Sequence, residues 1–219
     1  MSQRLMELLI NSFWQILLPG LKITIPLTLL SFALGLALAL LTAMVQAADV
    51  RGLKQLARLY VWVIRGTPLL VQLYVIFYGL PGLGLTLDAF PSAVIVFAVN
   101  TGAYASETIR AAIESVPEGQ MEAGYCVGMS YVQTMARIIL PQALRAAFPP
   151  LSNSLIGLVK DTSLAANITL MEMFMSAQRI AARTYEPFAL YCEVGAIYLI
   201  FCTALTKLQR VWEAKLKHE

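Results

Sequence analysis

The chain has 219 residues, of which 58% are hydrophobic and 13% are charged, and its formal net charge is +3 at pH 7. A soluble domain carries about twice this share of charged residues, so the composition excludes a soluble globular protein. The apolar residues also cluster in long runs without charge, which is typical of membrane spans. We therefore expect an all-α membrane protein.

Five spans are predicted along one membrane domain at residues 21–210. The clearest is the first, because no charge interrupts Ile23 to Val45 and about 20 residues suffice to cross the hydrocarbon core. The predicted spans cover about 21–46, 58–80, 88–110, 142–165 and 187–207, after an N-terminal interfacial segment at 1–20 and before a cytoplasmic tail at 211–219. Five crossings place the two termini on opposite sides of the membrane.

The basic residues predict which side is cytoplasmic. Eleven of the 16 lie on the side that holds the loop after the first span, the loop between the third and fourth spans, and the C-terminus, and five lie on the other side. Cytoplasmic loops carry an excess of Lys and Arg. We therefore expect the N-terminus outside and the C-terminus in the cytoplasm, and we interpret the basic residues as a topology signal rather than a nucleic-acid site.

A helical hairpin is predicted in the cytoplasmic loop at 115–141. Ser115 to Glu118 favours a helix start, because proline and acidic residues suit the first turn. Gly128 is expected to end this helix. Ser130 and Gln133 then have the spacing of a capping box for a second helix, and Pro141 is expected to mark a bend towards the fourth span.

The hairpin is expected to present Glu118 and Glu122 outward, with Ala123 and Gly124 as small residues at a point of close contact. Small residues allow two protein surfaces to approach closely, as a docking surface requires. The alternative is a solvated amphipathic loop with ordinary charges, and the local features alone leave both readings open.

The spacing along this loop resembles a known element. Glu122, Ala123 and Gly124, followed by Gly128 and by Ile138, Leu140 and Pro141, are similar to the EAA loop of bacterial ATP-binding-cassette (ABC) importer permeases. Position 124 departs from the usual alanine, and since glycine is smaller we expect docking to survive with a more flexible helix. The resemblance implies these contacts with an ATPase: Glu118, Gly119, Glu122, Ala123, Gly124, Gly128, Ile138, Leu140 and Pro141.

The resemblance extends over most of the chain. The stretches at 65–72, 100–110, 151–154 and 158–164 are similar to the polar amino acid branch of these permeases, and among its members to cystine permeases. This implies the transmembrane domain of a type I importer in a bacterial cytoplasmic membrane. Its implied partners are a second permease protomer, two cytoplasmic ATPases and an external binding protein that delivers an amino acid. A homodimer is the simpler assembly, although some relatives pair two different permeases.

Ionisable groups at membrane depth are costly, at about 3 kcal/mol or more each, so Lys160, Asp161 and Glu193 are candidates for the substrate path. The alternative is that Lys160 and Asp161 pair at the outer interface and that Glu193 packs against a neighbouring span. Polar residues in the spans either line the path or bridge helices; these are Asn100, Thr101, Tyr104, Asn153, Ser154 and Ser163. Arg65, Gly66 and Pro68 are expected to form a gate hinge or an ordinary span boundary.

Several chemistries are not supported. The single histidine is His218, and the three cysteines show no paired spacing, so we expect no catalytic or metal site. Gly79 to Gly84 superficially resembles a phosphate loop, but Leu85 and Thr86 follow where lysine and serine or threonine are needed. ATP and magnesium are therefore expected on the partner, with no cofactor in this chain. An ion-coupled secondary transporter or channel for a small polar solute is the alternative function, and a membrane-embedded enzyme is a third.

Overall fold

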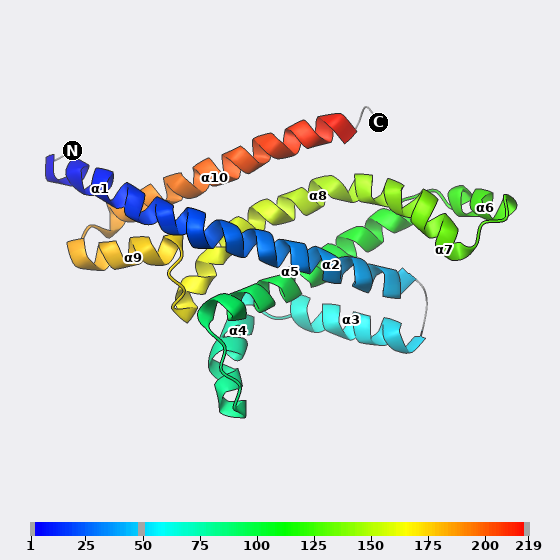
Figure 1. Ribbon diagram of the computed structural model, residues 1–219, viewed down its shortest axis with the longest axis horizontal. Coiled ribbons are helices and arrows are strands. Elements are labelled where there is room, and N and C mark those ends of the chain that lie inside the picture. The colour runs from blue at the N-terminus through cyan, green and yellow to red at the C-terminus, as the bar shows by residue number, and fades with distance from the viewer. Residues whose placement is uncertain (1–2, 48–50, 217–219) are drawn as a thin grey trace.

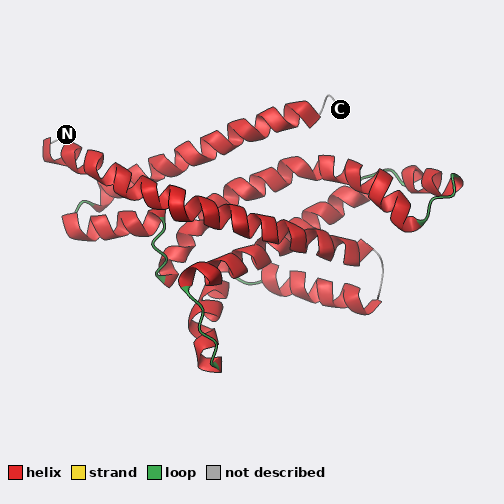
Figure 2. Cartoon of the chain, viewed as in Figure 1, coloured by secondary structure: helices red, strands yellow, loops and turns green. Residues whose placement is uncertain are grey.

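The computed structural model describes residues 3–47 and 51–216, and every secondary-structure element in these ranges is a helix (Figures 1 and 2). Helix α1 (Gln3–Pro19) continues through a π-helical turn, η1 (Gly20–Thr24), into α2 (Ile25–Ala47). The helix is therefore continuous across residue 20, where the interfacial segment was expected to end and the first span to begin. The last residues of the expected tail, 217–219, lie outside the described residues.

The second predicted span is sharply bent. Helix α3 (Arg51–Arg65) and the segment that begins with α4 (Leu69–Tyr74) meet at 103°. Pro68 has an extended backbone, with φ −64° and ψ 136°, and it cannot donate a backbone hydrogen bond. The chain therefore breaks at Gly66 to Pro68, within the span expected over about 58–80. The segment continues through η2 (Val75–Gly79) and η3 (Leu80–Leu83).

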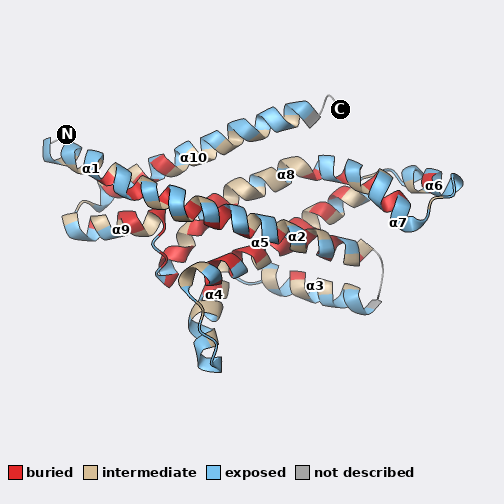
Figure 3. Cartoon of the chain, in the orientation of Figure 1, coloured by how far each residue is buried: buried red, intermediate tan, exposed pale blue. Residues whose placement is uncertain are grey.

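The core of the molecule forms around α5 (Ala89–Glu114), which packs along α2 and against α8 (Leu140–Asp161). Buried residues concentrate on α2 and α5 (Figure 3). Phe97 is fully buried at the centre, in one cluster with Leu27 and Leu158. A Cβ on Gly35 would lie 2.8 Å from Thr101 Cβ, so this glycine allows α2 and α5 to approach closely.

A second cluster joins α1, α9 (Met173–Thr184) and α10 (Pro187–Leu216). Glu172, which is fully buried, accepts hydrogen bonds from the backbone N–H groups of Phe174 (2.8 Å) and Met175 (2.6 Å) and from the Tyr198 hydroxyl (3.2 Å). It therefore caps α9 and ties it to α10. The 3-10 segment η5 (Thr162–Ile168) links α8 to this cluster.

Three π-helical turns each end two residues before a proline. They are η1 before Pro26, η2 before Pro81 and η4 (Met135–Ile139) before Pro141. Proline cannot donate to the carbonyl four residues earlier, and in each case that carbonyl lies at the middle of the π turn. A π turn shifts the bonding to i→i+5, so the helix continues. The helical segment beyond Pro141 is therefore continuous with the one before it, and the chain changes direction between α7 and α8 (Figure 1).

The arrangement of the helices agrees with a membrane protein. Within residues 3–47 and 51–216, three continuous helices are long and apolar enough to span a bilayer, and the bent pair of α3 with the segment from α4 onward makes a fourth if it is one span. Helix α8, which covers most of the expected fourth span at 142–165, has 22 residues but carries Arg145, Lys160 and Asp161. The N-terminus lies at one end of the long axis, and α10 runs back from that end toward the other (Figure 1).

Candidate functional site

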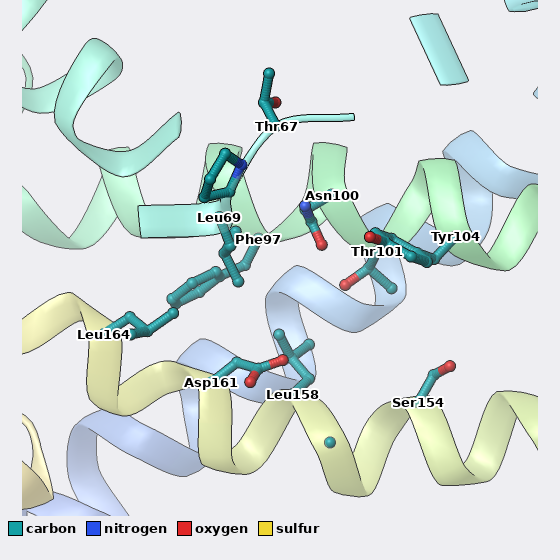
Figure 4. Close-up of a pocket in the computed structure, with 12 residues that line it drawn as sticks. Thr67, Leu69, Phe97, Asn100, Thr101, Tyr104, Ser154, Leu158, Asp161 and Leu164 are labelled. Atoms are coloured by element: carbon teal, nitrogen blue, oxygen red, sulfur yellow. The ribbon is translucent and has the colours of Figure 1, made fainter. Parts of the chain in front are cut away.

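A polar cavity lies where the α3–α4 break meets α5 and α8. Its volume is about 410 Å³, within the range of small-molecule sites. Its lining residues are Thr67, Pro68, Leu69, Phe97, Asn100, Thr101, Tyr104, Ser154, Gly157, Leu158, Asp161 and Leu164. The labelled side chains of α5 and α8 face each other across this space (Figure 4).

The lining combines one carboxylate with several neutral polar groups. Asp161 from α8 and Thr101 and Asn100 from α5 point into the space between the two helices (Figure 4). A carboxylate in such a recess attracts an ammonium group, and charge-assisted hydrogen bonds are the stronger ones. Within the described ranges, no group of three or more His, Cys, Asp or Glu side chains could hold a metal ion. A carboxylate beside neutral amide and hydroxyl groups is suited to binding a small polar solute.

Gln72 fixes the geometry of the break beside this cavity. Its Nε2 donates to the carbonyl of Ile64 (2.8 Å) and to the hydroxyl of Thr67 (2.9 Å). Asn100 Nδ2 donates to Gln72 Oε1 at 3.2 Å. Since the last carbonyls of a helix lack helical partners, Gln72 satisfies one of them and ties the break to α5. Sequence reasoning did not select Gln72, although it lies in the stretch that carries the family resemblance.

Gly157 lines the cavity, and because it has no side chain it leaves part of the cavity open. It lies on α8 between Ser154 and Asp161, and a Cβ added there would meet nothing within 4 Å. Helix packing therefore does not require a glycine here, and a larger side chain would occupy the cavity. Sequence reasoning also missed this residue, because a glycine within a span has no distinctive signal.

The expected path residues divide into two groups. Asn100, Thr101, Tyr104, Ser154 and Asp161 line the cavity, and four others do not. Three of the four side chains make local or structural contacts: Asn153 accepts from Gln209 Nε2 (3.3 Å), Ser163 donates to the Lys160 carbonyl (2.7 Å), and Glu193 accepts from the buried Ser12 hydroxyl. The fourth, Lys160, is exposed. The hydrogen bond between Glu193 and Ser12 therefore links α10 to α1.

Charged residues on α5 continue from the cavity toward the end that carries the hairpin. The Arg65 guanidinium lies 5.2 Å from the centre of the Tyr104 ring and 3.9 Å from the Glu107 carboxylate. Arg110 bonds both Glu107 (2.9 Å) and Glu114 (2.6 Å). A second cavity of about 380 Å³ is lined by Gln46, Lys54, Arg58, Glu107, Arg110 and Glu114. Arg65 thus stands between the two cavities, while Gly66 lies in the break itself and Pro68 lines the first cavity.

The hairpin has the predicted helix ends. It consists of α6 (Gly119–Cys126) and α7 (Tyr131–Thr134), followed by η4. Both bonds of the capping box are present: Gln133 N donates to Ser130 Oγ (3.3 Å), and Ser130 N donates to Gln133 Oε1 (2.9 Å). Gly128 has φ +80°, a left-handed conformation that favours glycine. The predictions for Gly128 and for the capping box are confirmed.

Gly124 lies inside the hairpin, although it was expected in the contact surface. It is buried against α7, and a Cβ on it would lie 2.4 Å from Thr134 Cγ2 and 2.5 Å from Thr134 Oγ1. The close approach that glycine allows is therefore between the two helices of the hairpin. Thr134 fills the space that an alanine at position 124 would need.

The outer surface of the hairpin is formed by other residues. Glu118, Gly119, Glu122, Ala123, Gly128 and Pro141 are exposed, and Ile138 and Leu140 are partly buried. Val127 and Val132 are exposed apolar residues near the tip, at 76% and 72% of their surface.

Tyr131 connects the hairpin to the first long helix. Its hydroxyl donates to the carbonyl of Ala47, the last described residue of α2, at 3.4 Å. Burial raises the pKa of the Tyr131 hydroxyl, and the neighbouring Tyr125 adds to this effect. The hydroxyl therefore stays protonated at neutral pH and remains a donor.

The fold and these features define an integral membrane protein in which helices enclose a small polar cavity and carry an exposed hairpin at one end. A family model described as binding-protein-dependent transport system inner membrane component matches residues 35–218. The chain belongs to this family.

Two curated relatives and one solved structure agree with this assignment. The chain is 53% identical over 211 residues to the L-cystine transport system permease protein TcyB of Bacillus subtilis (strain 168), covering 96% of this chain and 90% of that protein. It is 36% identical to the probable amino-acid ABC transporter permease protein YckA of the same strain, covering 97% and 93%. A crystal structure of an amino acid ABC transporter with histidines superposes with a TM-score of 0.83 at 35% identity, covering 88% and 90%.

Proposed function

We propose that the chain is the permease subunit of an ABC importer that carries a polar amino acid, with cystine favoured, into a bacterial cell. The cavity between α5 and α8 carries this proposal, because the Asp161 carboxylate lies opposite Asn100 and Thr101 there (Figure 4). Asp161 would meet a substrate ammonium group, and the amide and hydroxyl groups would accept or donate hydrogen bonds to the rest of a zwitterion. The 53% identity to a cystine permease supports cystine.

The energy is proposed to come from a partner ATPase that binds ATP and magnesium. Its docking site would be the hairpin surface of Glu118, Gly119, Glu122 and Ala123, together with exposed Val127 and Val132. On the opposite side of the membrane, a binding protein would deliver the amino acid. A second permease protomer, identical in the simplest assembly, would complete the path.

The helical connection between the hairpin and the cavity supports a mechanism of coupling. Helix α7, η4 and α8 follow one another without a break from Tyr131 to Asp161. A force on the hairpin would therefore move the helix that carries Ser154, Gly157 and Asp161. ATP binding by the partner would tilt α8 relative to α5 and open the path outward, and hydrolysis would reset it inward.

The substrate is tested by uptake in proteoliposomes that contain the permease, its ATPase and its binding protein. Labelled cystine, glutamine, arginine and histidine are compared, and ATP-dependent uptake with a preference for cystine is expected. Uptake by the permease alone along an ion gradient would contradict the proposal and favour a secondary transporter.

Docking is tested by crosslinking in cells. The three native cysteines are replaced by serine, and Ala123→Cys, which is exposed on α6, is compared with Thr169→Cys, which is exposed beyond α8 at the opposite end of the molecule. Capture of the ATPase by the first variant alone is expected. Failure of Ala123→Cys to capture it would refute the docking site.

A further inference from the structure

An apolar groove runs between α2, α8 and α10, on the side of α8 away from the polar cavity. Its volume is about 350 Å³, and its walls include Phe32 and Leu36 from α2, Leu151 and Leu155 from α8, and Leu208 and Trp212 from α10. Helix α10 is exposed along most of its length, and its residues Leu208 and Trp212, which line the groove, are themselves exposed (Figure 3). The groove therefore opens toward the surroundings of the helices.

The groove has a basic mouth at its C-terminal end. Trp212 is 51% exposed there, and the Lys215 ammonium lies 5.7 Å from the centre of its ring. Lys215 lies three residues after Trp212 and seven residues after Leu208, and hence on the same face of α10 as these two residues. Arg145 is exposed and lies three and seven residues before Phe148 and Ser152, which also line the groove.

Among the described residues of this part of α10, the carboxylate of Glu213 already has a partner. Glu213 accepts a hydrogen bond from Gln209 Nε2 at 2.7 Å. In the described part of the chain, Arg145 from α8 and Lys215 from α10 are thus cations at the end of an apolar channel. Basic residues on the cytoplasmic side between spans bind anionic lipid headgroups, and tryptophan is enriched at the membrane interface.

We propose that this groove binds an anionic phospholipid of the inner leaflet, with an acyl chain between α8 and α10 and the phosphate near Arg145 and Lys215. A second copy of the chain is a less suitable occupant, because a protein segment would have to supply a matching anion at the mouth. The proposal uses the orientation proposed above and does not depend on the substrate. Because α8 also lines the polar cavity, the lipid would contact the helix that is proposed to move.

The test uses Trp212 as a reporter. Trp14 and Trp62, the other two tryptophans, are replaced by phenylalanine, and the complex with its ATPase is reconstituted in bilayers with a small, equal fraction of brominated phosphatidylglycerol or brominated phosphatidylcholine. Bromine quenches tryptophan on contact. Stronger quenching by phosphatidylglycerol is expected, and Arg145→Gln or Lys215→Gln should each lower this preference about fivefold, since a cation near the surface contributes about 1 kcal/mol.

Arg210→Gln is the matched control, because it removes a cation from the same end of α10 on a different face. In the Arg210→Gln variant, the excess of quenching by brominated phosphatidylglycerol over brominated phosphatidylcholine should equal that of the parent protein. Equal quenching by the two lipids in the parent, or an equal loss in Arg210→Gln and Lys215→Gln, would overturn the site, since either result indicates only general attraction. Absence of quenching by both lipids would also overturn it, because the groove would then be covered by protein. Each variant is compared with its own fluorescence in unbrominated lipid and is checked for assembly with the ATPase.

Discussion

Replacing Gly124 with alanine tests whether the hairpin is built around this glycine. The new Cβ would lie 2.4 Å from Thr134 Cγ2 and 2.5 Å from Thr134 Oγ1, whereas non-bonded carbon atoms prefer about 3.5–4.0 Å. Thr134 is itself fully buried, and its hydroxyl donates to the Ser130 carbonyl at 3.1 Å. The side chain has little freedom to move, so the two helices of the hairpin must separate.

The expected cost follows from two opposing effects. Overpacking typically costs about 1–3 kcal/mol, and replacing glycine by alanine in a helix returns about 1 kcal/mol. We expect Gly124→Ala to destabilise the hairpin by about 1 kcal/mol. Adding Thr134→Ala removes the two closest atoms and leaves a distance of 3.0 Å to Thr134 Cβ. The double variant should therefore recover stability, with a favourable coupling energy of about 1–2 kcal/mol, a usual size for residues in contact.

Hydrogen exchange of the α6 and α7 amides measures the stability of the hairpin, and ATP-dependent uptake measures coupling. Gly119→Ala is the matched control, because a Cβ there would meet nothing within 4 Å on the same helix. If the α6 and α7 amides exchange as slowly in the Gly124→Ala variant as in the Gly119→Ala variant, the packing argument is refuted. Slower uptake in Gly124→Ala that returns in the double variant would connect the packing to transport.

Three further changes test the cavity and the fold. Gly157→Leu should abolish uptake without impairing assembly, because its side chain enters the cavity, whereas Gly195→Leu on α10, where a Cβ also meets nothing within 4 Å, should transport normally. Asp161→Asn should weaken substrate affinity about tenfold or more, since hydrogen bonds to charged groups contribute about 1.5–3 kcal/mol; KM for uptake measures this. Glu172→Ala should lower the stability to thermal unfolding by about 1–2 kcal/mol, because α9 loses its N-cap, with Glu172→Gln less affected.

Each of these expectations has a clear contrary result. Normal uptake by Gly157→Leu would mean that substrate does not pass through the cavity. An unchanged KM in Asp161→Asn would remove the carboxylate from substrate binding. Equal thermal stability of Glu172→Ala and the parent would mean that the buried hydrogen bonds of this carboxylate contribute little to the fold.

The sequence alone determined the features that depend on neighbours along the chain. Hydropathy indicated a helical membrane protein, Gly66 and Pro68 indicated the break after α3, and Ser130 with Gln133 indicated the start of α7. These are local effects: a missing backbone donor, a capping side chain or a charge-free run acts wherever the rest of the chain lies. The family resemblance of the hairpin was also visible, since its residues are close in sequence.

The tertiary structure decided which of these residues meet. In the folded chain Gly124 packs against Thr134, Asp161 lies opposite Asn100, and Glu193 accepts a hydrogen bond from Ser12 on another helix. Membrane helices carry polar residues on several faces, and only their packing decides which face lines a cavity and which joins two helices. A polar residue in a span therefore indicates that some contact is needed, but the sequence does not say which residue makes it. Ser12 and Glu193, which form a hydrogen bond, are 181 positions apart in the chain.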